Sequence, residues 1–280
     1  MNVAKRSAAV TQTAFVLHSH DWSESSLILE LFTREGGRVV AAAKGAKRPT
    51  SQLRAVLMPF QRITVQFART RGDAGSEVRT LRAAEWGGEA APMHGAAWFA
   101  GFYLNELLLR LLARDDAHPR LFDAYAAALG ALDGGEVREG SALRHEVRSE
   151  SALRAFELLL LQETGVLPEL HRTTLTQTPV QPLRRYVLRP EQGLGEVPAN
   201  DTSLSGACCL ALAQALQSWP AEGDPAAGFA VLQGACKVEL QPLKSQLRAQ
   251  LHYHLGGAPL RTRQMMIDAQ RLSDAESGKR

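Results

Sequence analysis

Residues 27–48 of the chain read LILELFTREGGRVVAAAKGAKR, and the pattern of this stretch decides the fold expected for the first third of the sequence. Its two apolar runs, residues 27–32 and 38–43, have the length and composition of β-strands. The segment Glu35-Gly36-Gly37 between them is a turn signal. A basic segment, KGAKR at residues 44–48, follows directly after the second run. The stretch therefore predicts two adjacent strands that lead into a basic loop.

Similar apolar runs lie outward on both sides, at residues 14–18, 63–68 and 78–84. Residues 50–58, just before Pro59, are suited to one or two helical turns. Five short strands with a small helix after the third match the plan of an oligonucleotide-binding (OB) barrel. Another small barrel or a sandwich remains an alternative on the pattern alone.

The rest of the chain changes to a helical period. The predicted helices span residues 97–112, 121–132, 141–164, 205–218, 228–235, 241–255 and 259–270. Between them, residues 171–204 are rich in Thr, Gln, Pro and Gly, with one strand candidate at 185–189. The sequence therefore predicts an α+β multidomain chain: a five-stranded OB barrel in residues 1–85 and an α-helical domain in residues 86–280, with an irregular insertion at 171–204.

The net charge of +3 conceals three blocks of different sign. Residues 1–82 carry 13 Lys and Arg against 6 Asp and Glu, residues 83–170 carry 7 against 14, and residues 171–280 carry 12 against 9. Blocks of opposite sign indicate separate surfaces with separate partners. The basic first block favours a polyanion, and nucleic acid and an anionic membrane surface both match. No run approaches the ~20 apolar residues of a membrane-spanning helix, so an integral membrane protein is not expected.

The basic loop after the third strand is the main candidate for nucleic-acid binding. Lys44, Lys47 and Arg48 surround Gly45, with Arg54 close behind, so the loop has the composition of a phosphate cradle. Arg34 and Arg38 flank the preceding Gly36-Gly37 turn and are expected to extend the same face. Further cations follow later in the barrel segment: Arg62, Arg69, Arg71, Arg79 and Arg82. Candidates for stacking on bases are Trp22, Phe32, Phe60 and Phe67. Phe32 and Phe67 continue apolar strands and are expected in the core. The alternative is a solvated basic loop without a ligand.

A second anion site is predicted near the C-terminal end. Residues 255–259, LGGAP, end one helix and begin the next. Arg261 and Arg263 then lie near a helix N-terminus, where cations interact unfavourably with the helix dipole. A bound anion, such as a DNA phosphate, would explain the two arginines. A plain corner between two helices is an equal alternative.

Signatures of enzymes and metal sites are weak. The sequence has no P-loop, no G-x-S-x-G and no H-E-x-x-H, so no catalytic residue and no cofactor are predicted. The three cysteines, Cys208, Cys209 and Cys236, form no C-x-x-C and no disulfide framework. A protein of the reducing cytoplasm is expected. An enzyme whose site is assembled from scattered residues remains an alternative.

The chain resembles bacterial RecO DNA repair proteins over most of its length. The resemblance rests on residues 17–26 (LHSHDWSESS), 37–48 (GRVVAAAKGAKR), 51–60 (SQLRAVLMPF), 84–85 (AE), 165–170 (GVLPEL) and 255–263 (LGGAPLRTR). It implies an OB barrel, a helical domain, and an insertion that binds zinc in many members. It also implies a nucleoid-associated recombination mediator without covalent catalysis. Such a protein binds single- and double-stranded DNA, anneals complementary strands, works with RecR, and helps load RecA onto DNA coated by single-stranded DNA-binding protein.

The sequence departs from the zinc-binding pattern of the family. Thr173 and Thr176 stand where such members place the first C-x-x-C, and Cys208 and Cys209 lie near the second pair without its spacing. Two thiols without a first pair cannot complete a tetrahedral site. No structural zinc is therefore expected, and the insertion must be held by packing or be loose.

The resemblance also implies that the acidic tail of the coating protein is a partner. Such a tail needs a basic and apolar pocket, for which Arg110, Arg114 and Arg120 with Leu109 and Phe122 are candidates. Ordinary surface arginines are the alternative at each position. For the protein as a whole, the rival hypothesis is an RNA-binding or ribosome-associated OB protein, since basic barrels also bind structured RNA.

Overall fold

The structure is a computed structural model, and it describes residues 11–68, 77–88, 93–132, 142–219, 223–265 and 268. The chain divides into two compact units: Met1–Ala90 with Leu112–Phe122, and Ala91–Leu111 with Asp123–Arg280. The predicted cations Arg69 and Arg71 lie outside the described residues. Within the described residues, no helix is long and apolar enough to cross a membrane.

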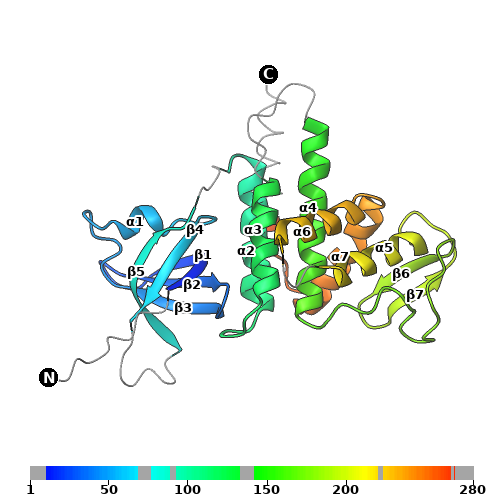
Figure 1. The fold of residues 1–280 in the computed structure, drawn as a ribbon, viewed down its shortest axis with the longest axis horizontal. Helices are drawn as coiled ribbons and strands as arrows, with labels where there is room; N and C mark the ends of the chain where they lie inside the picture. The colour runs from blue at the N-terminus through cyan, green and yellow to red at the C-terminus, as the bar shows by residue number, and fades with distance from the viewer. Residues whose placement is uncertain are drawn as a thin grey trace. The chain divides into compact units, whose positions relative to one another are not determined.

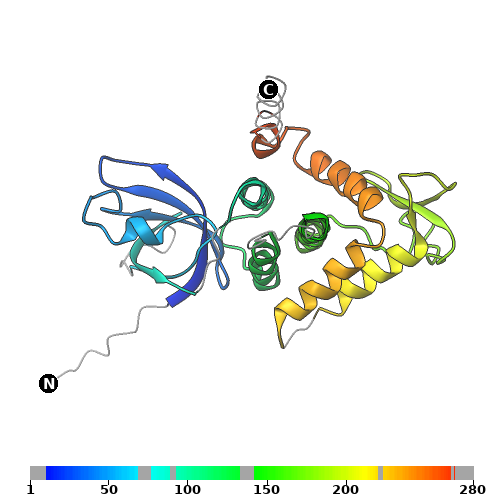
Figure 2. The same ribbon diagram turned by 90° about the horizontal axis from the view of Figure 1, so that it is seen from above.

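The first unit is a closed five-stranded barrel, as predicted (Figures 1 and 2). Its elements are β1 (Thr11–Asp21), β2 (Leu27–Thr33), β3 (Gly37–Ala43), α1 (Leu53–Val56), β4 (Arg62–Phe67) and β5 (Val78–Trp86). The strand order is β1-β2-β3-β5-β4, and β3 and β5 run parallel. Alternate apolar residues point inward because successive side chains of a strand face opposite ways. Leu29 and Leu31 of β2 and Val39 and Ala41 of β3 are buried in one core.

The pairing of β2 with β3 separates the two ends of the barrel. Thr33 pairs with Gly37 at one end, whereas Leu27 pairs with Ala43 at the other. The β2–β3 turn therefore lies about 20 Å along the strands from the loop after β3, at about 3.3 Å per residue. Because β1 ends where β2 begins, residues 22–26 lie at the same end as residues 44–48.

Residues 112–122, which come from between two helices, cover the end of the barrel that carries the β2–β3 turn. The Asp115 N–H donates to the carbonyl of Arg38 at 2.9 Å. Gly37 has φ +65°, and a Cβ on it would lie 1.7 Å from the carbonyl oxygen of Asp116. The ring of Phe122 lies 5.1 Å from that of Phe15 and 5.4 Å from that of Phe32. This end is closed by the chain itself.

The second unit is mainly helical, as predicted. Its helices are α2 (Ala96–Leu111), α3 (Pro119–Leu132, whose first turn belongs to the barrel unit), α4 (Ala142–Glu163), α5 (Gly206–Gln217), α6 (Pro225–Cys236) and α7 (Leu240–His254). Within this unit, α6 packs against both α4 and α5 (Figure 2). Helix α6 begins earlier than predicted because Asp224 caps it by accepting from the Ala226 N–H, and Pro225 occupies the first position.

The insertion contains a small sheet that the sequence analysis only partly anticipated. The strand predicted at 185–189 forms as β6 (Arg185–Arg189), but β7 (Gly193–Val197) and β8 (Leu204–Ser205) were missed. Gly193 adopts φ +70° at the turn into β7, a conformation suited to glycine.

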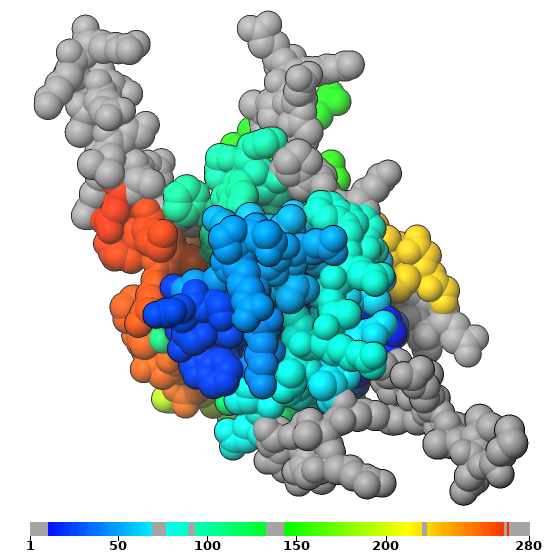
Figure 3. All heavy atoms as spheres, turned by 90° about the vertical axis from the view of Figure 1, so that its left-hand side faces the viewer, coloured from blue at the N-terminus to red at the C-terminus, as the bar shows by residue number. Residues whose placement is uncertain are grey.

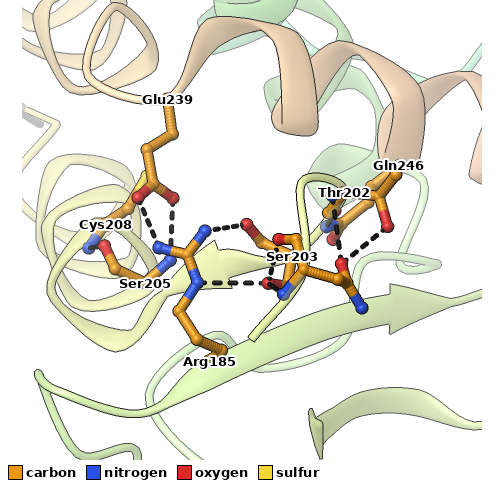
Figure 4. A network of polar contacts seen from close by, with 8 residues as sticks. Arg185, Thr202, Ser203, Ser205, Cys208, Glu239 and Gln246 are labelled. Atoms are coloured by element: carbon orange, nitrogen blue, oxygen red, sulfur yellow. Dashed lines mark hydrogen bonds and ion pairs between the residues drawn. The ribbon is translucent and has the colours of Figure 1, made fainter. Parts of the chain in front are cut away.

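A polar network ties this sheet to the segment that leads into α7 (Figure 4). Arg185 donates to the Glu239 carboxylate at 2.9 Å, and its Nε donates to the Ser203 hydroxyl at 3.1 Å. The other Glu239 oxygen accepts from the Ser205 N–H at 2.7 Å. The side chain of Gln246, on α7, bonds both Thr202 and the backbone of β6. The insertion is therefore held by partly buried hydrogen bonds as well as by packing.

Candidate nucleic-acid interface

Lys47 joins two loops at the end of the barrel opposite to the one that residues 112–122 cover; we call this end the open end. Its N–H donates to the Ser25 carbonyl at 3.0 Å, and its ammonium reaches the Ser23 carbonyl at 3.3 Å and the Asp21 carboxylate at 3.0 Å. The darker blue surface of the first strands and the lighter blue surface of the residues after β3 lie side by side in Figure 3. Lys47 is thus a structural clamp between residues 22–26 and residues 44–48.

The same loop and helix α1, which follows it, present three other cations to solvent. Lys44, Arg48 and Arg54 are exposed, and the described part of the chain offers none of them an acidic partner. Gly45 turns the chain with φ +73°, and Ala46, buried among the barrel core, anchors the loop. Exposed guanidinium and ammonium groups without carboxylates nearby are available to bind phosphates. We call Lys44, Arg48 and Arg54 the open-end cations.

Arg34 and Arg38 do not extend this surface. They flank the β2–β3 turn, at the opposite end of the strands. There Arg38 lies 3.7 Å from one Glu30 oxygen, and Arg114 donates to the other at 2.9 Å. The expectation that both arginines share a face with Lys44 is corrected by the strand pairing. The proposed DNA contacts of Arg34 and Arg38 stay predictions, at a separate place.

The later barrel arginines divide in the same way. Arg79 pairs with Asp115 of the covering segment, and its guanidinium lies 5.4 Å from the centre of the Phe67 ring. Arg62 and Arg82 are exposed on β4 and β5. Arg79 therefore helps to hold the covering segment, residues 112–122, on the barrel.

The four aromatic candidates differ sharply in exposure. Phe32 is fully buried and Phe60 is 8% exposed, whereas Phe67 packs against the barrel core. Trp22 is 59% exposed on the loop that Lys47 clamps. Phe67 packs against the barrel core, as expected, whereas Phe32 is buried against Phe122 and is not among the residues of that core.

The helix start at Arg261 and Arg263 already holds an anion from the same unit. The Glu106 carboxylate accepts from the N–H groups of Arg261 and Thr262, both at 2.9 Å, and from the Thr262 hydroxyl at 2.7 Å. Burial raises the pKa of Glu106, but these hydrogen bonds outweigh it and leave the pKa below the ordinary value. The anion predicted at this helix start is therefore Glu106. That Arg261 and Arg263 contact DNA remains a prediction, but it is no longer supported by the expected anion at the helix start.

The three arginines predicted to bind a partner tail have different surroundings. Arg110 donates to the Pro259 carbonyl, and its guanidinium lies 3.5 Å from the Glu106 carboxylate. It therefore belongs to the same group of contacts around Glu106. Arg114 pairs with Glu30 of the barrel unit, to which Arg120 also belongs. The structure does not show these arginines as one pocket.

A basic and apolar pocket lies elsewhere in the helical unit, and no local sequence pattern predicts it because its walls come from distant segments. The cavity measures about 450 Å³. Its charged lining is Glu150, Arg154, Glu157, Lys244, Arg248 and Arg263, and its apolar lining includes Leu153, Leu251, Leu255 and Leu260. Four basic residues against two acidic ones leave the pocket with a positive surplus.

A buried ion pair forms one wall of this pocket. Arg154 donates to Glu157 at 2.5 Å, and the Tyr103 hydroxyl donates to the same carboxylate at 2.6 Å. Burial raises the pKa of Glu157, against the opposing effects of Arg154 and the Tyr103 hydrogen bond. Among the described residues, Arg154 Nε and Glu157 Oε2 are buried without a hydrogen-bond partner. The wall therefore retains polar groups that a ligand can satisfy.

The positions that correspond to a zinc knuckle carry a hydroxyl network. The Thr173 and Thr176 hydroxyls lie 2.6 Å apart, and Thr173 also bonds the backbone of Thr178. Burial raises the pKa of Cys208 and of Cys209 to about 12, so both remain thiols at neutral pH. In the described part of the chain, no three His, Cys, Asp or Glu side chains are grouped to hold a metal.

Comparison with known proteins matches both units to one family. The family models described as Recombination protein O N terminal and Recombination protein O C terminal match residues 8–86 and 94–264. A DNA repair protein RecO of Albidiferax ferrireducens is 50% identical over 94% of this chain and 96% of its own length. The DNA repair protein RecO of a Polaromonas species is 49% identical over 93% of this chain and 97% of its own length. That of Verminephrobacter eiseniae is 46% identical over 97% of this chain and 100% of its own length.

Proposed function

The chain belongs to the RecO family of DNA repair proteins, and we propose that it is a recombination mediator that binds single- and double-stranded DNA and anneals complementary strands. It then helps to load RecA onto DNA coated by single-stranded DNA-binding protein. The observation that carries the proposal is the exposed set of open-end cations: Lys44 and Arg48 on a loop fixed to the barrel, and Arg54 on helix α1. The proposed role is binding, without covalent chemistry, in the cytoplasm at the nucleoid.

Annealing requires that two strands come close while their bases stay accessible. Cations that neutralise phosphates reduce the repulsion between strands and release counterions. The open-end cations act on the backbone and read no sequence, as annealing of arbitrary complements requires. Their loop keeps its shape because Ala46 is buried in the barrel core and Lys47 is clamped to the neighbouring loop.

The acidic tail of the coating protein is proposed to bind the pocket of the helical unit. Arg248 and Arg263 supply exposed positive charge beside the apolar walls, and the Arg154–Glu157 wall offers unsatisfied polar atoms. A tail with both carboxylates and apolar side chains matches this lining. The pocket replaces the earlier candidates because Arg110 and Arg114 are engaged by Glu106 and Glu30. RecR is the further proposed partner.

The test of the function is an annealing assay on complementary strands coated with single-stranded DNA-binding protein. Faster annealing by the wild-type protein, lost in Lys44→Ala with Arg48→Ala, is the expected result. No acceleration by the wild type overturns the proposal. Affinities for RNA and DNA of equal length at fixed salt test the rival RNA-binding function, which tighter binding to RNA would favour.

The pocket has a separate test with a peptide of the tail sequence. Arg248→Glu with Arg263→Glu is expected to abolish the titration, and Arg114→Glu with Arg120→Glu is expected to leave it unchanged. The reverse result would return the site to the earlier arginines.

A further inference from the structure

We infer that Trp22 is the stacking platform for an unpaired base, and that it makes the open end of the barrel selective for single strands. This inference rests on the proposed DNA-binding function and assigns a role to one side chain. Of the four aromatic residues with the right chemistry, Phe32 and Phe60 are buried, and Phe67 packs against the barrel core. Trp22 alone among these four presents its ring to solvent.

The loop that carries Trp22 is fixed by its own hydrogen bonds. The Trp22 N–H donates to the Ser26 carbonyl at 3.2 Å, and the Ser26 N–H donates to the Ser23 hydroxyl at 3.2 Å. Ser26 is buried, so the base of the turn is anchored in the barrel. A ring held on an ordered turn loses little conformational freedom when a base stacks on it.

The turn that carries Trp22 is bonded to the basic loop on both sides of this residue. Lys47 bonds the carbonyl of Ser23, the residue after Trp22, and the carboxylate of Asp21, the residue before it. The same loop carries Lys44 and Arg48. A strand whose phosphates contact these cations therefore passes the indole. An exposed indole beside unpaired cations suits a ligand with a flat apolar face and an anionic backbone, which describes single-stranded DNA.

Stacking and charge make separable contributions to binding. In a duplex the base faces are covered by neighbouring pairs, so Trp22 has no face to contact there. Phosphates are present in both forms, so Lys44 and Arg48 contribute to both. Loss of one stacked base weakens single-strand binding by about 5- to 150-fold. Duplex binding should change by less than about twofold.

The experiment measures the affinity of the full-length protein for a labelled oligothymidylate and for a duplex of equal length at one salt concentration. Trp22→Ala is expected to lose single-strand affinity only, and Trp22→Phe, which keeps an aromatic face, to lose less. Trp86→Ala is the matched control because Trp86 is 52% exposed in the same unit. It should change neither affinity.

Tryptophan emission gives a second readout. Quenching by oligothymidylate is expected in the wild type and in Trp86→Phe but not in Trp22→Phe. Equal loss of single-strand and duplex affinity in Trp22→Ala, or no loss of either, overturns the inference while leaving DNA binding intact. Absence of DNA binding by the wild type would instead overturn the proposed function.

Discussion

Replacing Lys44 and Arg48 together by alanine is expected to weaken single-strand binding about 25-fold at 0.1 M salt. Both side chains are exposed and lack an acidic partner among the described residues, so each is assigned one phosphate contact. Each contact contributes about 0.7 to the slope of log K against log salt, so two contribute about 1.4. If the wild type and the double variant bind equally at 1 M salt, a slope difference of about 1.4 makes the variant bind about 25-fold more weakly at 0.1 M salt. This factor corresponds to ~2 kcal/mol of binding free energy. For duplex DNA, with about 0.9 per contact, the loss rises to about 60-fold.

The assay is fluorescence anisotropy of a labelled strand, titrated at several salt concentrations. The slope of the double variant should be shallower by about 1.4, and its affinity should approach that of the wild type as salt nears 1 M. The matched control is Arg144→Ala with Lys237→Ala, which removes the same charge from exposed positions of the helical unit. If the control shifts the slope as much as the test variant, net charge explains binding and the loop does not.

The fold must survive the substitutions for this comparison to hold. Exposed residues away from the core usually change the free energy of unfolding by less than about 0.5 kcal/mol. Ala46 and Lys47, which fix the loop, are untouched. A double variant that keeps both the wild-type slope and the wild-type affinity would refute the assignment of phosphates to this loop.

Three further outcomes follow from the packing and hydrogen bonding. Gly37→Ala should lose about 2–4 kcal/mol of unfolding free energy in urea, because φ is +65° and the new Cβ meets Asp116 O; a loss below ~0.5 kcal/mol would contradict the covering segment. Glu106→Gln should lower stability at pH 7. The hydrogen bonds from Thr262 outweigh burial and lower the pKa of Glu106 in the folded protein. The stabilisation by Glu106 is therefore complete above about pH 4.3 and falls as the pH drops through the folded pKa. A Glu106→Gln variant whose unfolding free energy depends on acid pH as in the wild type would refute this. Metal analysis should find no stoichiometric zinc, because residues 173–178 are held by hydroxyl groups; stoichiometric zinc would refute the expectation.

The barrel was predictable because its signals are local. Alternating apolar residues, Gly-rich turns and the basic loop each lie within a few residues of one another, and β2 and β3 formed where the pattern indicated. That the five strands form a barrel followed from their match to the plan of an OB barrel. The same local reasoning failed for Arg34 and Arg38. They are close to Lys44 in the sequence, but the length of strand β3 separates them from Lys44 in space.

The missed features all depend on residues far apart in the chain. Glu106 meets Thr262, and Glu30 meets Arg114, through folding that no local pattern encodes. Acidic residues on helix α2 and strand β2 carry no mark of such partners. The short strand β7 was hidden because two of its five residues are glycine, which strands disfavour.

The covering segment 112–122 has a consequence for how the protein is made. The chain leaves the barrel unit at residue 90 and returns to it at residue 112. During translation, Phe15 and Phe32 cannot contact Phe122 until that residue has been synthesised. At ordinary translation rates this happens about 2–6 s after residue 90 is added. The barrel unit is thus the first to begin, but it is complete only after helix α2 of the other unit has been synthesised. A gene fragment that stops near residue 90 would leave Phe15 and Phe32 without their contact to Phe122, and it is expected to self-associate through this apolar surface.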